Sequence, residues 1–142
     1  MIRELTMDYY DGIIEMFIAT PGVTFREADS REAMERYLKR NPGLSFVAEE
    51  DSEIFGCILC GHDGRRGYLQ HLVVRPEHRN KGVGEELVKK CIDALDKIGI
   101  SKTHIFVFKT NDPGNSFWAG KGWQLREDVN MYSYNPSENV NA

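Results

Sequence analysis

The residues best suited to chemistry form a short basic stretch that contains two glycines, Arg79–Gly84 (Arg-Asn-Lys-Gly-Val-Gly). A helix is predicted to follow directly, and the first amides of a helix have no partner within it. The helix dipole adds roughly half a positive charge at that end. Gly82 and Gly84 carry no side chain, so a phosphate can approach the backbone closely, and Arg79 and Lys81 add positive charge. The stretch therefore predicts a pyrophosphate site, although two glycines can also form nothing more than a tight turn.

A strand before this stretch and a helix after it must hold it in place. Tyr68 to Arg75 is rich in β-branched, aromatic and other apolar residues, which predicts a strand, and Pro76 ends it because proline cannot donate to a strand ladder. After the stretch, apolar residues at spacings of three, four and seven predict an amphipathic helix that Gly99 ends. These apolar residues are Val83, Leu87, Val88, Cys91, Ile92, Leu95 and Ile98.

The sequence departs from each of two other phosphate-binding motifs at a required position. A P-loop requires Gly-Lys and then Ser or Thr, but Gly82 is followed by Val83. A dinucleotide fingerprint requires a third glycine three residues after Gly84, where Leu87 stands. Arg/Gln-x-x-Gly-x-Gly/Ala after a strand that ends near a proline fits Arg79–Gly84 fully. In this setting the stretch resembles the acyl-CoA-binding loop of the GNAT superfamily of N-acetyltransferases.

The first half of the chain predicts a strand at Met1 to Leu5 and then two helices. Asp8 is expected to cap the first helix, and Asp29-Ser30-Arg31-Glu32 is expected to form a capping box for the second. The segment between them, residues 21–29, is either an acceptor-binding loop or a plain connector. Two strands, Leu44 to Glu49 and Ile54 to His62, then lead through an Asp-Gly turn to the central strand.

The second half predicts a buried strand, Thr103 to Phe108, parallel to the central strand because a helix connects the two. A short helix capped by Asp112 and a last strand, Val129 to Tyr134, follow. The spacing of Asn111, Gly114, Phe117-Trp118 and Gly122-Trp123 is similar to that of GNAT proteins, as is the order of elements, β-α-α-β-β-β-α-β-α-β.

The resemblance implies an α/β (α+β) fold. We expect a mixed, mostly antiparallel central sheet with a splayed parallel strand pair, flanked by helices. A single domain, 1–134, and a polar C-terminal tail, 135–142, are expected.

Composition limits the class of protein. The 142 residues suit one soluble globular domain, with 41% hydrophobic and 28% charged residues. The net charge of −4 argues against general nucleic-acid binding. Cys57 and Cys60 have CxxC spacing, but they lie in an apolar strand whose residues three apart face opposite sides, so reduced core thiols are expected. No signal peptide or membrane-spanning stretch is seen, and a cytoplasmic location is expected.

The resemblance also implies acetyl-CoA as the acyl donor, with no metal. Leu72, Val73 and Val74 would offer backbone groups to the pantetheine arm. The pyrophosphate would be held by Arg79, Asn80, Lys81, Gly82, Val83 and Gly84. Asn111, Asn115 and Trp118 would line the arm, although Trp118 can equally be a core residue.

The catalytic groups depart from those common in the family. Acetyl transfer needs an amine that has lost its proton, and a base or a water relay must remove that proton. The positions that often carry a carboxylate are Tyr68 and Phe106 here, so Tyr68 and Gln70 are expected to order a water. Trp118 stands where the family usually has a Tyr acid; an indole donates a hydrogen bond but no proton, and Tyr132 or Tyr134 is a possible substitute.

His71 is a further candidate base, because imidazole titrates near neutral pH. Strand alternation points it away from the face of Tyr68 and Gln70, unless a β-bulge turns it back. A hydrogen-bonded histidine without a catalytic role is the alternative.

We therefore expect an N-acetyltransferase acting on a primary amine of a small molecule or protein. The alternative is a CoA-binding module with reduced catalysis that acts as a sensor or interaction protein. Glu27, Asp29 and Glu32 are a weak indication of a cationic acceptor, whose identity the sequence leaves open. A homodimer is expected only from the resemblance.

Overall fold

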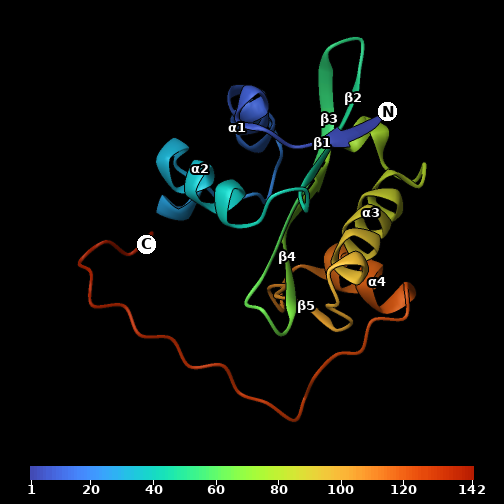
Figure 1. Cartoon of the computed structure of the whole chain (residues 1–142). Coiled ribbons are helices and arrows are strands. Elements are labelled where there is room, and N and C mark those ends of the chain that lie inside the picture. Colours follow the sequence, from blue (N-terminus) through green and yellow to red (C-terminus); the bar gives the residue numbers. More distant parts are fainter. The chain divides into compact units, whose positions relative to one another are not determined.

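The computed structural model describes residues 1–142, which divide into two compact units. The first unit comprises Met1–Ile105 and Asn141, and the second comprises Phe106–Val140 and Ala142. The first unit contains the sheet and the predicted phosphate loop (Figure 1).

The sheet has five strands in the order β1-β2-β3-β4-β5. Neighbouring strands pair in antiparallel fashion except for β4 and β5, which are parallel. The predicted mixed sheet with one parallel pair is therefore confirmed. The strands are β1 Ile2–Glu4, β2 Phe46–Glu50, β3 Glu53–His62, β4 Gly67–Val74 and β5 Thr103–Ile105.

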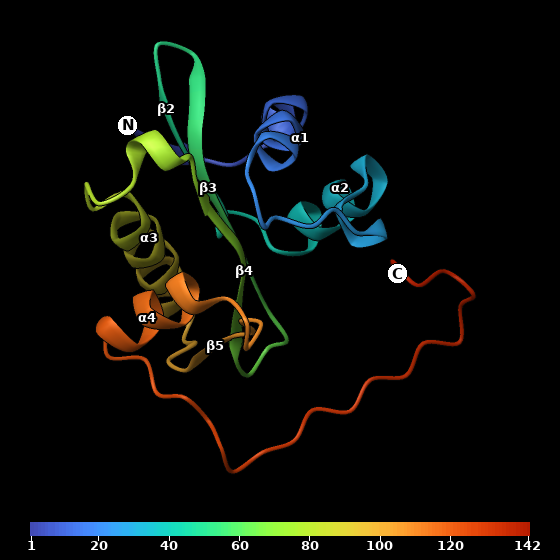
Figure 2. The same cartoon turned by 180° about the vertical axis from the view of Figure 1, so that it is seen from behind.

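Helices cover both faces of the sheet in the first unit. Helices α1 (Tyr10–Ala19) and α2 (Arg31–Arg40) lie on one face, and α3 (Val83–Lys97) lies on the other (Figures 1 and 2). Short 3₁₀ turns precede three of the elements: η1 at Met7–Tyr9, η2 at Glu27–Asp29 and η3 at Pro76–His78. The predicted stripe of α3 is confirmed, because Leu87, Cys91 and Leu95 are fully buried.

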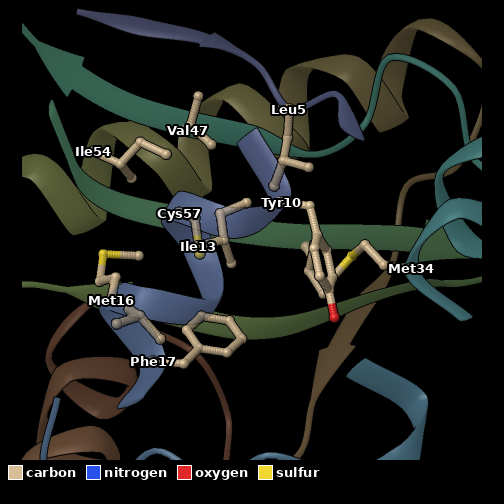
Figure 3. Close-up of a cluster of buried hydrophobic side chains, with 11 residues drawn as sticks. Leu5, Tyr10, Ile13, Met16, Phe17, Met34, Val47, Ile54 and Cys57 are labelled. Carbon is tan, nitrogen blue, oxygen red and sulfur yellow. The ribbon is translucent and has the colours of Figure 1, made fainter. Parts of the chain in front are cut away.

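The core beneath α1 places the elements that later form the candidate site. Figure 3 shows Ile13 and Phe17 of α1 beside Val47 and Cys57 of the sheet. Burial of such side chains stabilises each by roughly 1.5–3 kcal/mol relative to exposure. The buried members are Leu5, Tyr10, Ile13, Met16, Phe17, Met34, Val47, Ile54, Cys57, Leu59 and Val73.

Three predicted helix caps are each displaced by one residue. Asp8 lies within η1 and caps nothing with its side chain. Ser30 rather than Asp29 is the N-cap of α2, since its Oγ accepts a hydrogen bond from the amide of Ala33 at 3.2 Å. The last helix, α4 (Asp112–Gly120), is capped by Asn111 in place of Asp112. In α2 and α4, the side chain of the residue next to the predicted cap accepts a hydrogen bond from a free amide of the first turn.

Two predicted strands in the C-terminal part also differ. β5 ends at Ile105 and does not reach Phe108. No strand forms between Val129 and Tyr134, where the side chains of Val129, Met131 and Tyr132 are exposed. An apolar alternating segment becomes a strand only when a neighbouring strand pairs with its backbone, and the sequence pattern does not supply that partner.

The cysteine prediction is confirmed in its geometry. Cys57, Cys60 and Cys91 are all buried free thiols. Cys57 belongs to the core under α1, whereas Cys60 lies beside Cys91 of α3 and so on the other face. No helix is long and apolar enough to cross a membrane, and no group of three His, Cys, Asp or Glu residues is arranged to hold a metal ion.

Candidate active site

The candidate site begins where β4 loses its parallel partner. β4 and β5 pair at Gly67–Thr103, Tyr68–His104 and Leu69–Ile105. β4 then continues to Val74, whereas β5 has ended. The β5-facing edge of β4 is therefore open after Leu69, as the predicted splay requires.

Backbone groups point out from this open edge. The amide of Arg75 donates to the carbonyl of Phe55 on β3 at 2.8 Å. Because backbone groups alternate between the two edges of a strand, the amide and carbonyl of Val74, and those of Leu72, face away from β3. The Val74 carbonyl accepts a hydrogen bond from Arg79 Nε at 2.9 Å. Val73 points its side chain into the core and is 6% exposed.

The loop after β4 has the backbone of an anion cradle. Asn80 and Gly82 both have positive φ angles, 62° and 82°. Gly82 is the N-cap residue of α3, and no side chain caps the helix. A Cβ at Gly82 would meet no atom within 4 Å, so open space lies in front of the backbone. An anion can therefore reach the start of α3.

The charges around this helix start are mixed. Arg79 and Lys81 are exposed, and the first turn of α3 also carries Glu85 and Glu86. The four formal charges cancel, so a phosphate would depend on the backbone amides and on close approach of the two cations.

A β-bulge interrupts β4 beside the open edge. Cys57 of β3 pairs with Val73, and Leu59 pairs with Gln70. Two residues of β4 therefore lie between these pairs, opposite a single residue of β3. His71 lies in this interval with a φ angle of +48°. This left-handed conformation costs roughly 1–2 kcal/mol for a residue with a Cβ, and His tolerates it better than most.

The bulge changes the face on which His71 lies. Cross-strand partners share a face, and Leu59, the partner of Gln70, is part of the core under α1. Strict alternation would put His71 on the α3 side. Instead its ring lies 4.8 Å from the ring of Phe17 in α1. The bulge therefore places His71 on the same face as Gln70, and the position expected from alternation alone is wrong.

His71 forms an ion pair or charged hydrogen bond with Asp29. Its Nε2 lies 2.7 Å from Asp29 Oδ1, and the two side chains are 22% and 5% exposed. The other carboxylate oxygen, Oδ2, accepts from the amide of Arg26 at 2.9 Å. Tyr10 Oη donates to the backbone carbonyl of Asp29 at 2.7 Å. Asp29 is therefore held at both carboxylate oxygens and at its backbone.

The Asp29 carboxyl is stabilised in its ionised form. Burial alone raises its pKa, but the hydrogen bonds from His71 and from the Arg26 amide, with the nearby positive charge, lower the pKa below its usual range. The neighbouring Cys57 thiol, by contrast, has its pKa raised to about 12 by burial. Asp29 is thus the charged group in contact with His71 near neutral pH.

The other two predicted catalytic residues on β4 lie nearby on this face. Tyr68 pairs with His104 of β5, and their rings are 5.7 Å apart. Gln70 is exposed. Both are positioned to contact solvent or a ligand on the face covered by α1 and α2, and their role in ordering a water remains a prediction.

The second unit holds the remaining predicted residues. Asn111 Oδ1 accepts from the amide of Gly114 at 3.0 Å, and Asn115 Nδ2 donates to the carbonyls of Asn111 and Phe108, both at 2.9 Å. Trp118 is 8% exposed, and its ring lies 4.7 Å from that of Trp123. These contacts account for the two amides and the indole as structural groups, and their contacts with a cofactor remain predictions.

Sequence reasoning missed the partnership between Asp29 and His71. Asp29 was expected to be a helix cap, and the two residues come from elements far apart in the chain. The only local indication of this contact was His71 itself, a titratable residue in the central strand where a bulge was possible.

An open strand edge thus leads into a glycine-containing helix start that no side chain caps. The profile described as the acetyltransferase (GNAT) family matches residues 8–123. The chain therefore belongs to this family, and the resemblance seen in its sequence is confirmed.

Two curated relatives support the same class of enzyme. An acetyltransferase of Pectobacterium atrosepticum is 36% identical over 84 residues, which cover 59% of this chain and 60% of that protein. An acetyltransferase of Photorhabdus laumondii is 32% identical over 115 residues, covering 78% and 77%. Both relatives are named acetyltransferases, and the match spans only 60% of the length of the first.

A solved structure supports the fold. The PaiA N-acetyltransferase of Thermoplasma acidophilum, solved in complex with coenzyme A, has a TM-score of 0.78 at 22% identity, covering 91% of this chain and 92% of that one. At this identity the likeness confirms the fold alone.

Proposed function

We propose that this protein is an acetyl-CoA-dependent N-acetyltransferase that moves an acetyl group directly to a primary amine of a small molecule or protein. The observation that carries the proposal is the open edge of β4, which runs from Leu69 to Val74 and then into the start of α3. A linear cofactor with a peptide-like arm and a pyrophosphate matches both features in the order in which they follow each other. Its arm matches the open edge, and its pyrophosphate matches the helix start. The relative solved with coenzyme A supports the choice of cofactor.

The residues of this chain have distinct parts in the proposed binding mode. The outward backbone groups of Leu72 and Val74 extend the sheet onto the pantetheine arm, as an added strand would. The amides at the start of α3, with Arg79 and Lys81, hold the pyrophosphate. The Val74 carbonyl already accepts a hydrogen bond from Arg79, so its amide is the freer group.

The reaction needs three things from the protein. The acceptor ammonium must lose a proton, since a free amine has a pKa near 10. Its nitrogen then attacks the thioester carbonyl, whose oxygen gains negative charge, and an outward backbone amide of β4 near Val74 is the proposed donor to that oxygen. The C–S bond breaks, and the CoA thiolate, with an ordinary thiol pKa near 8.5, leaves and takes up the second proton of the amine.

The competing proposal is a CoA-binding module without transfer. The presence of Trp118 where the family usually has a Tyr that acts as general acid favours this second proposal. Both proposals require the cofactor site, so binding and turnover must be measured separately.

The first experiment is thermal unfolding with and without acetyl-CoA. A ligand at about 100 times its Kd stabilises the native state by about 2.7 kcal/mol, which corresponds to a rise in Tm on the order of 8 °C here. Release of the CoA thiol is then measured with a polyamine, an aminoglycoside and a peptide with a free N-terminus. A rise in Tm with thiol release supports the transferase, and a rise without release for any amine favours the module. An unchanged Tm would overturn the cofactor site.

A further inference from the structure

The bulge in β4 puts an imidazole and a carboxylate together at the open edge. His71 has no regular strand conformation, as its φ angle of +48° shows. Non-glycine residues persist in such conformations only where their surroundings enforce them, and they concentrate at functional sites. The enforcing contacts are the 2.7 Å link to Asp29 and the packing of the ring against Phe17.

The position of His71 along β4 fits a role in transfer. It comes two residues after Leu69, where the parallel ladder ends, and directly before Leu72, whose backbone faces the open edge. Its side chain lies on the face covered by α1 and η2, where it contacts Asp29, the last of residues 21–29. The side chain is 22% exposed, which leaves it accessible to an acceptor.

We propose that His71 is the general base that takes the proton from the acceptor ammonium, and that Asp29 is the residue that positions it. This inference rests on the proposed transferase function and adds the group that the sequence left open. Nε2 carries its hydrogen toward Asp29 Oδ1, which leaves the lone pair on Nδ1 to receive the proton. The neutral amine then attacks the thioester, and the resulting imidazolium returns its proton to solvent.

The charged surroundings support this assignment. From η2, Asp29 contacts the ring directly; from β3, Cys57 Sγ lies 3.8 Å from the His71 carbonyl; from α1, Tyr10 binds the Asp29 carbonyl. Burial raises the pKa of both Cys57 and Tyr10, so both are neutral when the base acts. On β4 itself, Tyr68 shares the face. The carboxylate of Asp29 is therefore the charged group in direct contact with the ring, and the charge of Arg26 acts on that carboxylate.

The first test removes the imidazole without straining the bulge. Glycine adopts a φ angle of +48° freely, so His71→Gly leaves the backbone undisturbed and opens a space the size of the ring. We expect kcat to fall by about 10²-fold or more, while the rise in Tm with acetyl-CoA persists. Added imidazole is expected to restore turnover. Pyrazole has the same ring size but is a far weaker base, and it is expected to restore none.

A second variant tests the positioning role of Asp29. Asp29→Asn keeps the size of the side chain but removes the negative charge that contacts the ring. The kcat is expected to fall by roughly 10-fold or more, while the KM for acetyl-CoA and the rise in Tm with acetyl-CoA stay unchanged, because Asp29 holds the ring and not the cofactor. A residue that only supports the fold would change the response to acetyl-CoA together with kcat.

The outcomes separate the base from the transferase. If the wild type releases CoA with an amine but His71→Gly keeps full kcat, or pyrazole rescues as well as imidazole, the base assignment is wrong and the transferase stands. An unchanged kcat in Asp29→Asn would overturn the role of Asp29. If acetyl-CoA raises the Tm of the wild type but no amine releases CoA, both the transferase and its base are wrong.

Discussion

Leu69 of β4 and Ile105 of β5 form the last pair of the parallel ladder, and β4 continues beyond it to Val74. The opening starts at this pair because β5 ends there. A backbone edge without a neighbour in the sheet is a template for an added strand or a strand-like ligand. The open edge, the helix start and the bulge all lie within one continuous stretch of chain, from β4 to the first turn of α3.

The pyrophosphate cradle is tested by Gly82→Trp. The bulky side chain would fill the open space in front of the amides of α3, so we expect the rise in Tm with acetyl-CoA to disappear. Gly99→Trp is the matched control. Gly99 has a φ angle of 84°, close to the 82° of Gly82, and a Cβ there also meets no atom within 4 Å, but it lies at the other end of α3.

Both variants are expected to lose roughly 1–2 kcal/mol of stability from the left-handed backbone. Only Gly82→Trp should lose the response to acetyl-CoA. Equal responses in the two variants would show that the cradle does not bind the cofactor.

Trp118→Tyr tests the missing acid. A tyrosine hydroxyl could protonate the leaving thiolate, so kcat is expected to rise, by up to about 10²-fold. The edge-to-face contact with Trp123 would be weakened, so a stability loss of roughly 1–2 kcal/mol is expected as well. Steady-state kinetics and thermal unfolding measure the two effects.

Trp123→Tyr makes the same exchange on the other ring of the pair and should lower stability without raising kcat. If Trp118→Tyr lowers kcat at unchanged acetyl-CoA affinity, the indole itself contributes to the reaction.

The acid stability of the fold should depend on Asp29. Its pKa is lower in the folded protein than in the unfolded chain, so the unfolded chain binds a proton more readily. This contribution is complete above the unfolded pKa, near 3.8, and is lost as the pH falls through the lower folded value. The stability difference between wild type and Asp29→Asn is therefore expected to be largest near neutral pH and to shrink below about pH 4.

Urea unfolding between pH 3 and pH 7 measures this difference. Asp11→Asn removes the same charge from an exposed ion pair with Arg31, and it should have a much smaller effect. A difference for Asp29→Asn that stays constant over the whole range would contradict the depressed pKa.

The three thiols should be inert in the native protein. Burial raises the pKa of Cys57 to about 12, and a hydrogen bond with Cys60 together with burial raises the pKa of Cys91. The thiolate is the reactive form, so Ellman's reagent is expected to react slowly with the folded protein and with three thiols in denaturant. Rapid reaction of any thiol in the folded protein would place it at the surface.

Local sequence patterns were enough for the parts of the site that depend on neighbouring residues. The apolar spacing predicted α3, the glycines predicted its uncapped start, and Pro76 predicted the end of β4. The parallel direction of β5 followed from the helix that connects it to β4. The predicted strand at Val129 to Tyr134 failed, because its formation depends on a pairing partner that the pattern does not specify.

The sequence by itself determined the family, the sheet and the loop, since these follow from propensity, periodicity and a short motif. The tertiary structure alone decided where His71 points and what holds it. Strand alternation put His71 on the wrong face, because a bulge adds one residue and reverses the order of faces beyond it. The carboxylate that meets it, Asp29, comes from a turn between two helices, and only the packing of α1 and η2 on the sheet brings the two together.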